Sequence, residues 1–387
     1  MTPLTLHDAI AIAGGLATAE NCPGVIPLDH FAQLGATTAS VGQHFDQVLV
    51  RAKRRHQGAI ALTMSPSFSC QVRPLGDDRF VLLVPLGMPA RTRVLARLLL
   101  RYWGRERGVR VIRSALDDVP GDADAVPPLL KPVFLEDFEP DTFWERLREL
   151  DASIDTDPRT EPDVLELVHL ALVYLLSHEF THVLHGHFDL LERVRSGEVD
   201  LTRDDVRRGI ELDADDGAAA LSMLILKDDV DRAVAAGQRG QSQAVGWLRL
   251  SYVVTMLFAI TDAHRKFLGA YERGAYNHPM VRCEFFLEAA GRSLDAPKRV
   301  RDTWLANSTE GWKRCVQALD DLNLDALRGD FGKLPEGVHP APLHTLLYSA
   351  TPVGVTDRAT LETLIEAHRL VHRIREHLPI FRKSPGT

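Results

Sequence analysis

The sequence has little cysteine, few aromatic residues and no apolar run of membrane-spanning length. Its 387 residues include 4 cysteines, none in a CxxC pair, and 7% aromatic residues. So few cysteines exclude a scaffold built from disulfides and favour ordinary thiols in a reducing compartment. The longest apolar stretch, within Leu250–Ile260, is shorter than the roughly 20 residues that a bilayer requires. The N-terminus lacks the basic region of a signal peptide. We therefore expect a cytoplasmic protein without a membrane span.

Basic residues are fewer than acidic ones, and the two kinds are segregated. Residues 1–115 carry 14 Lys and Arg against 7 Asp and Glu, residues 116–163 carry 4 against 15, and residues 164–387 carry 27 against 31, which sums to the net charge of −8. The middle segment also holds 7 of the 22 prolines. At roughly 100–200 residues per domain, this pattern predicts an N-terminal domain (1–115), an acidic proline-rich connection (116–163) and a C-terminal domain (164–387).

Local patterns predict an α+β protein. In the N-terminal domain, apolar runs at 58–64 and 79–87 are bounded by Gly, Pro or Asp, as strands are, and helical patterns accompany them. The expected domain is of mixed α/β type. Beyond residue 162 the pattern is almost entirely helical, which predicts a mainly α-helical second domain. The expected helices lie at about 141–150, 164–187, 202–227, 245–268, 280–291 and 359–378.

A row of arginines recurs every four residues: Arg93, Arg97, Arg101 and Arg105. That spacing places them on one side of a helix. The favoured interpretation is a polar face paired with the acidic connection, as a cover over the functional cleft. The alternative is a basic surface for nucleic acid or another acidic partner.

The residues that point to chemistry are His178, Glu179 and His182, an HExxH motif inside the most apolar predicted helix. Histidines four residues apart project from one helix face, so both imidazoles can bind one metal ion at about 2.0–2.1 Å. Glu179 lies beside them and can act as the general base on a metal-activated water. The apolar turns before the motif predict that the histidines are partly buried, and buried imidazoles need partners.

A third ligand is predicted on the helix at 202–227. Glu211 and Asp215 are four residues apart and share one face. Glu211 can complete a His₂Glu zinc site that keeps a position for water. Asp215 can accept a hydrogen bond from a ligand histidine and fix its tautomer. Small residues would let this helix pack closely on the HExxH helix: Ala214, Gly217, Ala218, Ala219 and Ala220.

This arrangement resembles the gluzincin zinc metallopeptidases, most closely the M48-like group, and is also similar to the soluble phage-exclusion peptidase Lit. M48-like enzymes carry a histidine five residues after the second ligand, here His187. They also carry a His-Pro pair followed by an arginine, here His278 and Arg282. The spacing between this histidine and arginine is shorter here than in typical members of the group. The resemblance covers residues 165–290 and implies a zincin-like metallopeptidase domain in which His278 donates to the oxyanion. Tyr276 is a second candidate for that role, and Arg282 a weaker substrate-side candidate.

Alternatives exist for these assignments. The two motif histidines could lie on a solvated helix face, and Glu211 could be an ordinary surface acid, since Asp213 and Asp216 are nearby. His278 could be a turn residue before proline.

His185 returns to nearly the same face as His178 and could be a ligand. Gly186 favours a helix end at this point, so a role beside the ligands or toward the substrate is favoured for His185. A metzincin site is excluded, because it would need glycine at position 185 and His or Asp where the sequence has Phe188.

The predicted function is a zinc-dependent endopeptidase that hydrolyses a specific cytoplasmic protein substrate through a metal-activated water. Phage defence, repressor cleavage and stress-signal processing are all compatible with it. The alternative is a sensing or binding protein with a basic N-terminal surface for nucleic acid or protein and a regulated or structural metal site. Nucleic acid is a possible but less favoured partner.

Overall fold

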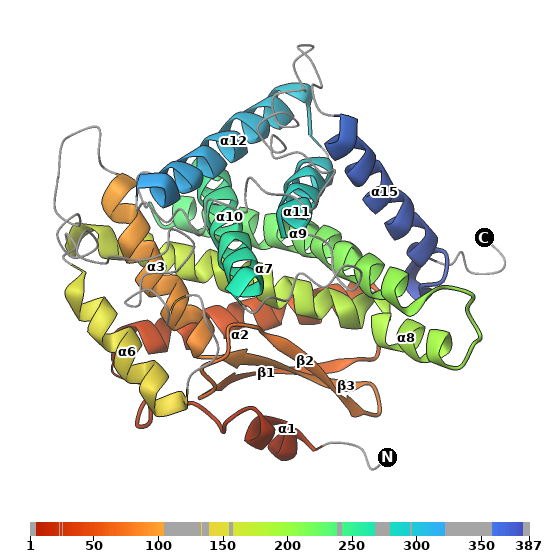
Figure 1. The fold of residues 1–387 in the computed structure, drawn as a ribbon, viewed down its shortest axis with the longest axis horizontal. Coiled ribbons are helices and arrows are strands. Elements are labelled where there is room, and N and C mark those ends of the chain that lie inside the picture. The colour runs from red at the N-terminus through yellow and green to blue at the C-terminus, as the bar shows by residue number, and fades with distance from the viewer. Residues whose placement is uncertain are drawn as a thin grey trace.

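The computed structural model describes residues 5–22, 24, 26–103, 133, 139–154, 158–237, 242–267, 279–294, 296–321 and 358–381. Within them the chain is mainly helical with one three-stranded sheet, which confirms the broad α+β class (Figure 1). The elements of the N-terminal part are α1 (Leu6–Ile12), α2 (Leu28–Arg51), β1 (Gln57–Thr63), β2 (Gln71–Gly76), β3 (Arg79–Pro85) and α3 (Gly87–Trp103). The elements that follow are α6 (Pro140–Ser153), η2 (Pro158–Thr160), α7 (Glu161–His185), α8 (His187–Arg195), α9 (Arg203–Ala235), α10 (Gln243–Phe267), α11 (Pro279–Ser293), α12 (Lys298–Asp321), α15 (Arg358–Arg375) and η3 (Pro379–Phe381).

The sheet has β3 in the middle, parallel to β1 and antiparallel to β2. A two-residue turn, Asp77 and Asp78, joins β2 to β3 with positive φ at both positions, as a tight hairpin requires. One face of β3 packs with α1 through Val81 and Leu83, and its other face joins the main core. Because both faces are buried, β3 is apolar from Phe80 onward, and this continuous apolar run predicts a strand. The predicted strand at β1 is confirmed as well.

Helices α7 and α9 cross the middle of the molecule, with α2 and the sheet below them and α10, α11 and α12 above them in the view of Figure 1. The close approach of α7 and α9 depends on small residues, as predicted. A Cβ atom on Gly217 would lie 2.4 Å from the Cγ2 atom of Thr181, so a larger residue there would force the two helices apart. This contact places Glu211 and Asp215 opposite the HExxH residues.

The predicted helices are confirmed in position, with ends that differ by a few residues. Thr202 begins α9, because its hydroxyl accepts a hydrogen bond from the Asp205 backbone N–H. Gly186 ends α7 in the left-handed conformation at φ 81°, as expected from its position. The longest difference is at the C-terminal end of α9, which continues to Ala235 instead of ending near residue 227.

The arginine row of α3 is paired with the acidic connection where the structure describes it. Arg93 and Arg97 both donate to the Asp151 carboxylate, and Arg93 also donates to Glu161 at 3.1 Å. The side chains of Arg101 and Arg105 lie outside the described residues. The predicted pairing is thus confirmed for Arg93 and Arg97, and in the described part of the chain it lies away from the cleft. Glu161 lies 17 residues before His178 on the same helix, about 26 Å along its axis.

A continuous hydrophobic core joins residues of all three predicted segments, for example Leu82, Leu147 and Leu172. By length and composition alone, α7 and the Gln243–Thr261 part of α10 could cross a membrane. Core helices pass the same test, and most of both helices is buried inside the protein. Every residue of Leu250–Ile260 is buried, as expected for a core helix.

Candidate metal centre

His178, His182 and Glu211 converge at the C-terminal end of α7 and form a group that could hold a metal ion. The Nε2 atoms of the two histidines are 3.3 Å apart. The Glu211 Oε2 atom lies 3.5 Å from His178 Nε2, and its Oε1 atom lies 3.9 Å from His182 Nε2. Ligands bound tetrahedrally at 2.0–2.2 Å from one ion lie about 3.3–3.6 Å apart. The three side chains therefore fit a single small metal ion.

Asp215 and Arg282 support the first side of this group. The Asp215 carboxylate is fully buried, and its Oδ1 atom lies 2.9 Å from His178 Nδ1. Its other contacts are the Tyr174 hydroxyl, which donates at 3.0 Å, and Arg282, which donates at 2.7 Å and 2.9 Å. Arg282 also lies 3.0 Å from Glu211. A carboxylate at Nδ1 orients the imidazole so that Nε2 faces the ion.

The second side of the group is supported through His187. Its Nδ1 atom lies 2.8 Å from His182 Nδ1, and its Nε2 atom lies 2.8 Å from Asp213 Oδ2. His185 also contacts Asp213 Oδ2 through its Nδ1 atom. All these side chains are buried, and Asp213 is completely so. Asp213, which the sequence suggested only as one of several nearby acids, is therefore a buried partner of two histidines.

The charges of the site follow from burial and from these contacts. Burial alone would lower the pKa of His178, but the carboxylates of Asp215 and Glu211 outweigh it and raise the pKa to about 9. Burial alone would raise the pKa of Glu211, but Arg282 and His178 hold it below its usual range. Burial and the neighbouring His187 keep the pKa of His182 well below its ordinary value. The centre thus combines an ionised carboxylate with imidazoles, a donor set suited to a divalent cation.

Glu179 lies at the floor of a cleft of about 440 Å³ between the sheet and helices α7, α8 and α9. The cleft is also lined by His182 and Glu211 and, on the other wall, by the residues from Ser69 to Arg73. One carboxylate oxygen of Glu179 accepts a hydrogen bond of 2.9 Å from the backbone N–H of Val72 on β2. Burial raises the pKa of Glu179 to about 7.

The structure thus brings together five of the residues selected from the sequence: His178, Glu179, His182, Glu211 and Asp215. Arg282, predicted as a substrate-side candidate, also belongs to the site, but its guanidinium pairs with the carboxylates of Glu211 and Asp215. His185 contacts Asp213 and is not part of the group formed by His178, His182 and Glu211. His278 and Tyr276 lie outside the described residues, so their predicted oxyanion role stays a prediction.

Sequence analysis missed four contributors to the site, of which Asp213 was noted only as a nearby acid. Tyr174 precedes His178 by four residues, so helical spacing could have placed the two on one face. The Val72 backbone N–H and the Arg375 side chain, which contacts Asp213, come from elements more than a hundred residues away in sequence. No local pattern could have found these two.

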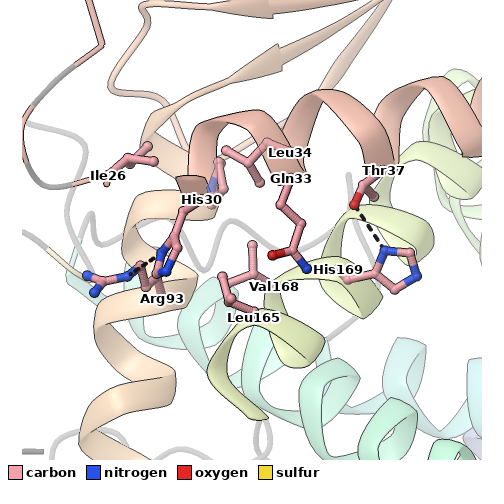
Figure 2. Close-up of a pocket in the computed structure, with 10 residues that line it drawn as sticks. Ile26, His30, Gln33, Leu34, Thr37, Arg93, Leu165, Val168 and His169 are labelled. Atoms are coloured by element: carbon pink, nitrogen blue, oxygen red, sulfur yellow. Dashed lines mark hydrogen bonds between the residues drawn. The ribbon is translucent and has the colours of Figure 1, made fainter. Parts of the chain in front are cut away.

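A second cavity lies between α2, α3 and α7 and is lined by His30, Thr37, Arg93 and His169 (Figure 2). Two of its hydrogen bonds join elements: Arg93 donates to His30, and Thr37 contacts His169 at 3.1 Å. Its volume of about 10 Å³ gives room for about one water molecule, so the cavity is a small packing defect that cannot hold a substrate.

Comparisons with known proteins return no match: no protein-family model, no curated protein and no solved structure matches this chain. The chemistry of the site therefore rests on its own residues.

Proposed function

We propose that this chain is a zinc-dependent endopeptidase of the gluzincin type, with a zincin-like active site built from α7, α9 and β2. The observation that carries the proposal is the arrangement around Glu179. This carboxylate lies in the cleft beside the group of His178, His182 and Glu211, and it is tied to the edge of a β-sheet.

Zinc is the metal that suits these ligands best. Two imidazoles and one carboxylate are a common ligand set of catalytic zinc sites, which leave a fourth position open. A bound zinc ion would polarise the scissile carbonyl and lower the pKa of a water ligand. The chain's own residues would hold the ion: His178 and His182 through Nε2, and Glu211 through its carboxylate.

Glu179 is the residue placed to move a proton. Its Oε2 atom is held by Val72, which fixes the carboxylate at the cleft floor. In the proposed reaction it takes a proton from the attacking water and passes it to the leaving amine. Asp215 and Arg282 take no part in proton transfer in this scheme, because they are engaged with the ligands.

The nature of the cleft wall favours a peptide as the substrate. β2 is an edge strand of the described sheet and lines the cleft; its Val72 N–H is taken by Glu179, so a peptide would pair with the other outward backbone groups of the strand. An exposed sheet edge can bind an extended peptide through main-chain hydrogen bonds. Gln71 and Arg73 flank Val72 on the same wall and would contact the peptide's side chains. A specific protein segment in extended form is thus the proposed substrate.

The test is the metal content and peptidase activity of wild type, Glu179→Gln and His178→Ala. Wild type and Glu179→Gln should each bind one zinc ion per chain, His178→Ala should bind none, and only wild type should cleave. Full activity of Glu179→Gln would contradict the mechanism. Zinc lost together with the fold in His178→Ala, while Glu179→Gln stays fully functional, would indicate a structural metal instead.

A further inference from the structure

A chain of buried hydrogen bonds leads from His182 to the C-terminal helix α15. His182 contacts His187 at 2.8 Å, and His187 contacts Asp213 at 2.8 Å. Arg375 of α15 then pairs with Asp213 and with Asp216. These two aspartates lie about one helical turn apart on α9. We call His187, Asp213 and Arg375 the relay.

The relay fixes which nitrogen of His182 carries a proton. Asp213 pairs with the Arg375 guanidinium and lies within hydrogen-bond distance of both imidazoles, so its carboxylate is the acceptor. His187 must then donate through Nε2. A neutral imidazole that donates through Nε2 offers Nδ1 only as an acceptor, and His187 Nδ1 lies 2.8 Å from His182 Nδ1. His182 therefore donates through Nδ1 and keeps the lone pair of Nε2 for the metal.

The distances indicate protons in the relay and not a second metal ion. His185, His187 and Asp213 also form a group whose ligand atoms lie close together. However, both imidazoles lie within 2.8 Å of one oxygen atom, Asp213 Oδ2. That is hydrogen-bond length and shorter than the roughly 3.3 Å between two ligands of one tetrahedral ion.

Helix α15 is held firmly enough to act in this way. One apolar cluster buries Leu370 and Ile374, together with Leu378 just after the helix, against α8 and α9. A second cluster buries Ala367 and Val371 against Leu212 of α9 and residues of α11. These two apolar clusters hold α15 against α9, so the ion pair between Arg375 and Asp213 joins two packed helices.

We propose that Asp213, clamped by Arg375 of α15, is a positioning residue that sets the tautomer of His182 through His187, so that the C-terminal helix is part of the metal centre. This inference rests on the proposed zinc site. It adds Asp213, which lies 31 residues after His182 in sequence, as a residue that controls zinc affinity.

The experiment compares the zinc affinity of wild type, Asp213→Asn and Asp216→Asn, measured by competition with a chromophoric chelator. Asp213→Asn keeps the shape but removes the charge that orients His187, so we expect a 10–100-fold weaker zinc affinity. Asp216→Asn is the matched control. It also removes one negative charge that pairs with Arg375, but Asp216 contacts neither His185 nor His187. It should bind zinc as wild type does.

A long-range ¹⁵N–¹H NMR spectrum of the zinc-loaded wild type tests the same inference without a variant. It should show His182 protonated at Nδ1 and His187 protonated at Nε2 only. The relay is overturned by equal zinc affinity of Asp213→Asn and wild type, by His187 protonated at Nδ1, or by two zinc ions in wild type and one in Asp213→Asn. A wild type that binds no zinc overturns the proposed function itself, whereas an unchanged affinity in Asp213→Asn overturns the relay alone.

Discussion

At the scale of single residues, the candidate metal centre balances buried charges of opposite sign. Arg282 is 8% exposed and is the cation closest to Glu211 and Asp215. Two ionised carboxylates cannot stay buried together without compensation, so the arginine offsets them when no metal is bound. A divalent ion would add positive charge on the side of Glu211.

Arg282→Met should therefore destabilise the zinc-free protein strongly, by about 3–5 kcal/mol, because it leaves buried carboxylates unpaired. Saturating zinc should reduce this loss, since the ion replaces part of the missing charge. Urea unfolding with zinc and with a chelator measures both values. Arg292→Met is the control: Arg292 forms partly exposed pairs with Asp216 and Glu288, which are worth about 0–1 kcal/mol. Equal losses in the two variants would contradict the account of Arg282.

Glu284 on α11 gives the protein a pH dependence that is separate from the metal. It is 6% exposed, and its Oε1 atom has no hydrogen-bond partner among the described residues. Burial raises its pKa to about 8 from an ordinary 4.5. The folded state therefore keeps this proton at pH values where the unfolded state has lost it, and stability falls as the pH rises from about 5 to about 8.

Glu284→Gln removes this titration. We expect the variant to exceed wild type by on the order of 1–3 kcal/mol at pH 9 and to differ little at pH 5, in urea unfolding at the two pH values. Glu288→Gln should show no gain at pH 9, because pairing with His368 and Arg292 outweighs burial and lowers the pKa of Glu288. A gain of equal size at both pH values would show that packing, and not charge, explains Glu284→Gln.

At the scale of elements, the helices that build the site could be predicted from the sequence and some of their neighbours could not. The length, apolar content and capping residues of α7 and α9 predict both helices from the sequence. β2 was missed because Arg73 and Pro74 interrupt its alternation. α12 was missed because Ser308, Thr309 and Gly311 separate the large apolar residues of its buried face, Trp304 and Leu319.

The same limit applies to the candidate site. The ligands and Asp215 follow from helical spacing alone. Asp213 could not be distinguished from Asp216, because consecutive acids occur all around this turn of α9 and only the packing of α8 and α15 decides which is buried. Arg375 is 162 residues from Asp213 in sequence, so only the fold brings them together.

The contact between α3 and α6 is structural and remote from the metal. Asp151 accepts from both Arg93 and Arg97, and its side chain is 18% exposed. Asp151→Asn should cost about 1–3 kcal/mol of stability, because two largely buried arginines lose a charged acceptor. Thermal unfolding measures the loss, and zinc affinity should not change. Glu149→Gln, in an exposed pair with Arg146, is the control with little expected effect. Weakened zinc binding in Asp151→Asn would contradict the separation of this contact from the site.

At the scale of the whole molecule, the cleft belongs to two predicted segments at once. The wall from Ser69 to Arg73 comes from residues 1–115, whereas the metal ligands come from residues 164–387. The hydrogen bond from Val72 to Glu179 joins the two walls. The N-terminal sheet therefore forms one wall of the candidate site. The charge segregation in the sequence corresponds in part to buried pairs such as Arg93 with Asp151.

The most direct measurement of the central claim is the set of new protein N-termini in cells that express wild type or Glu179→Gln at equal levels. The account predicts a small set of cleavage sites in extended protein segments that appear with wild type and are absent with Glu179→Gln, although both chains carry one zinc ion. The same N-termini in both samples, or none in either with zinc fully bound, would contradict it.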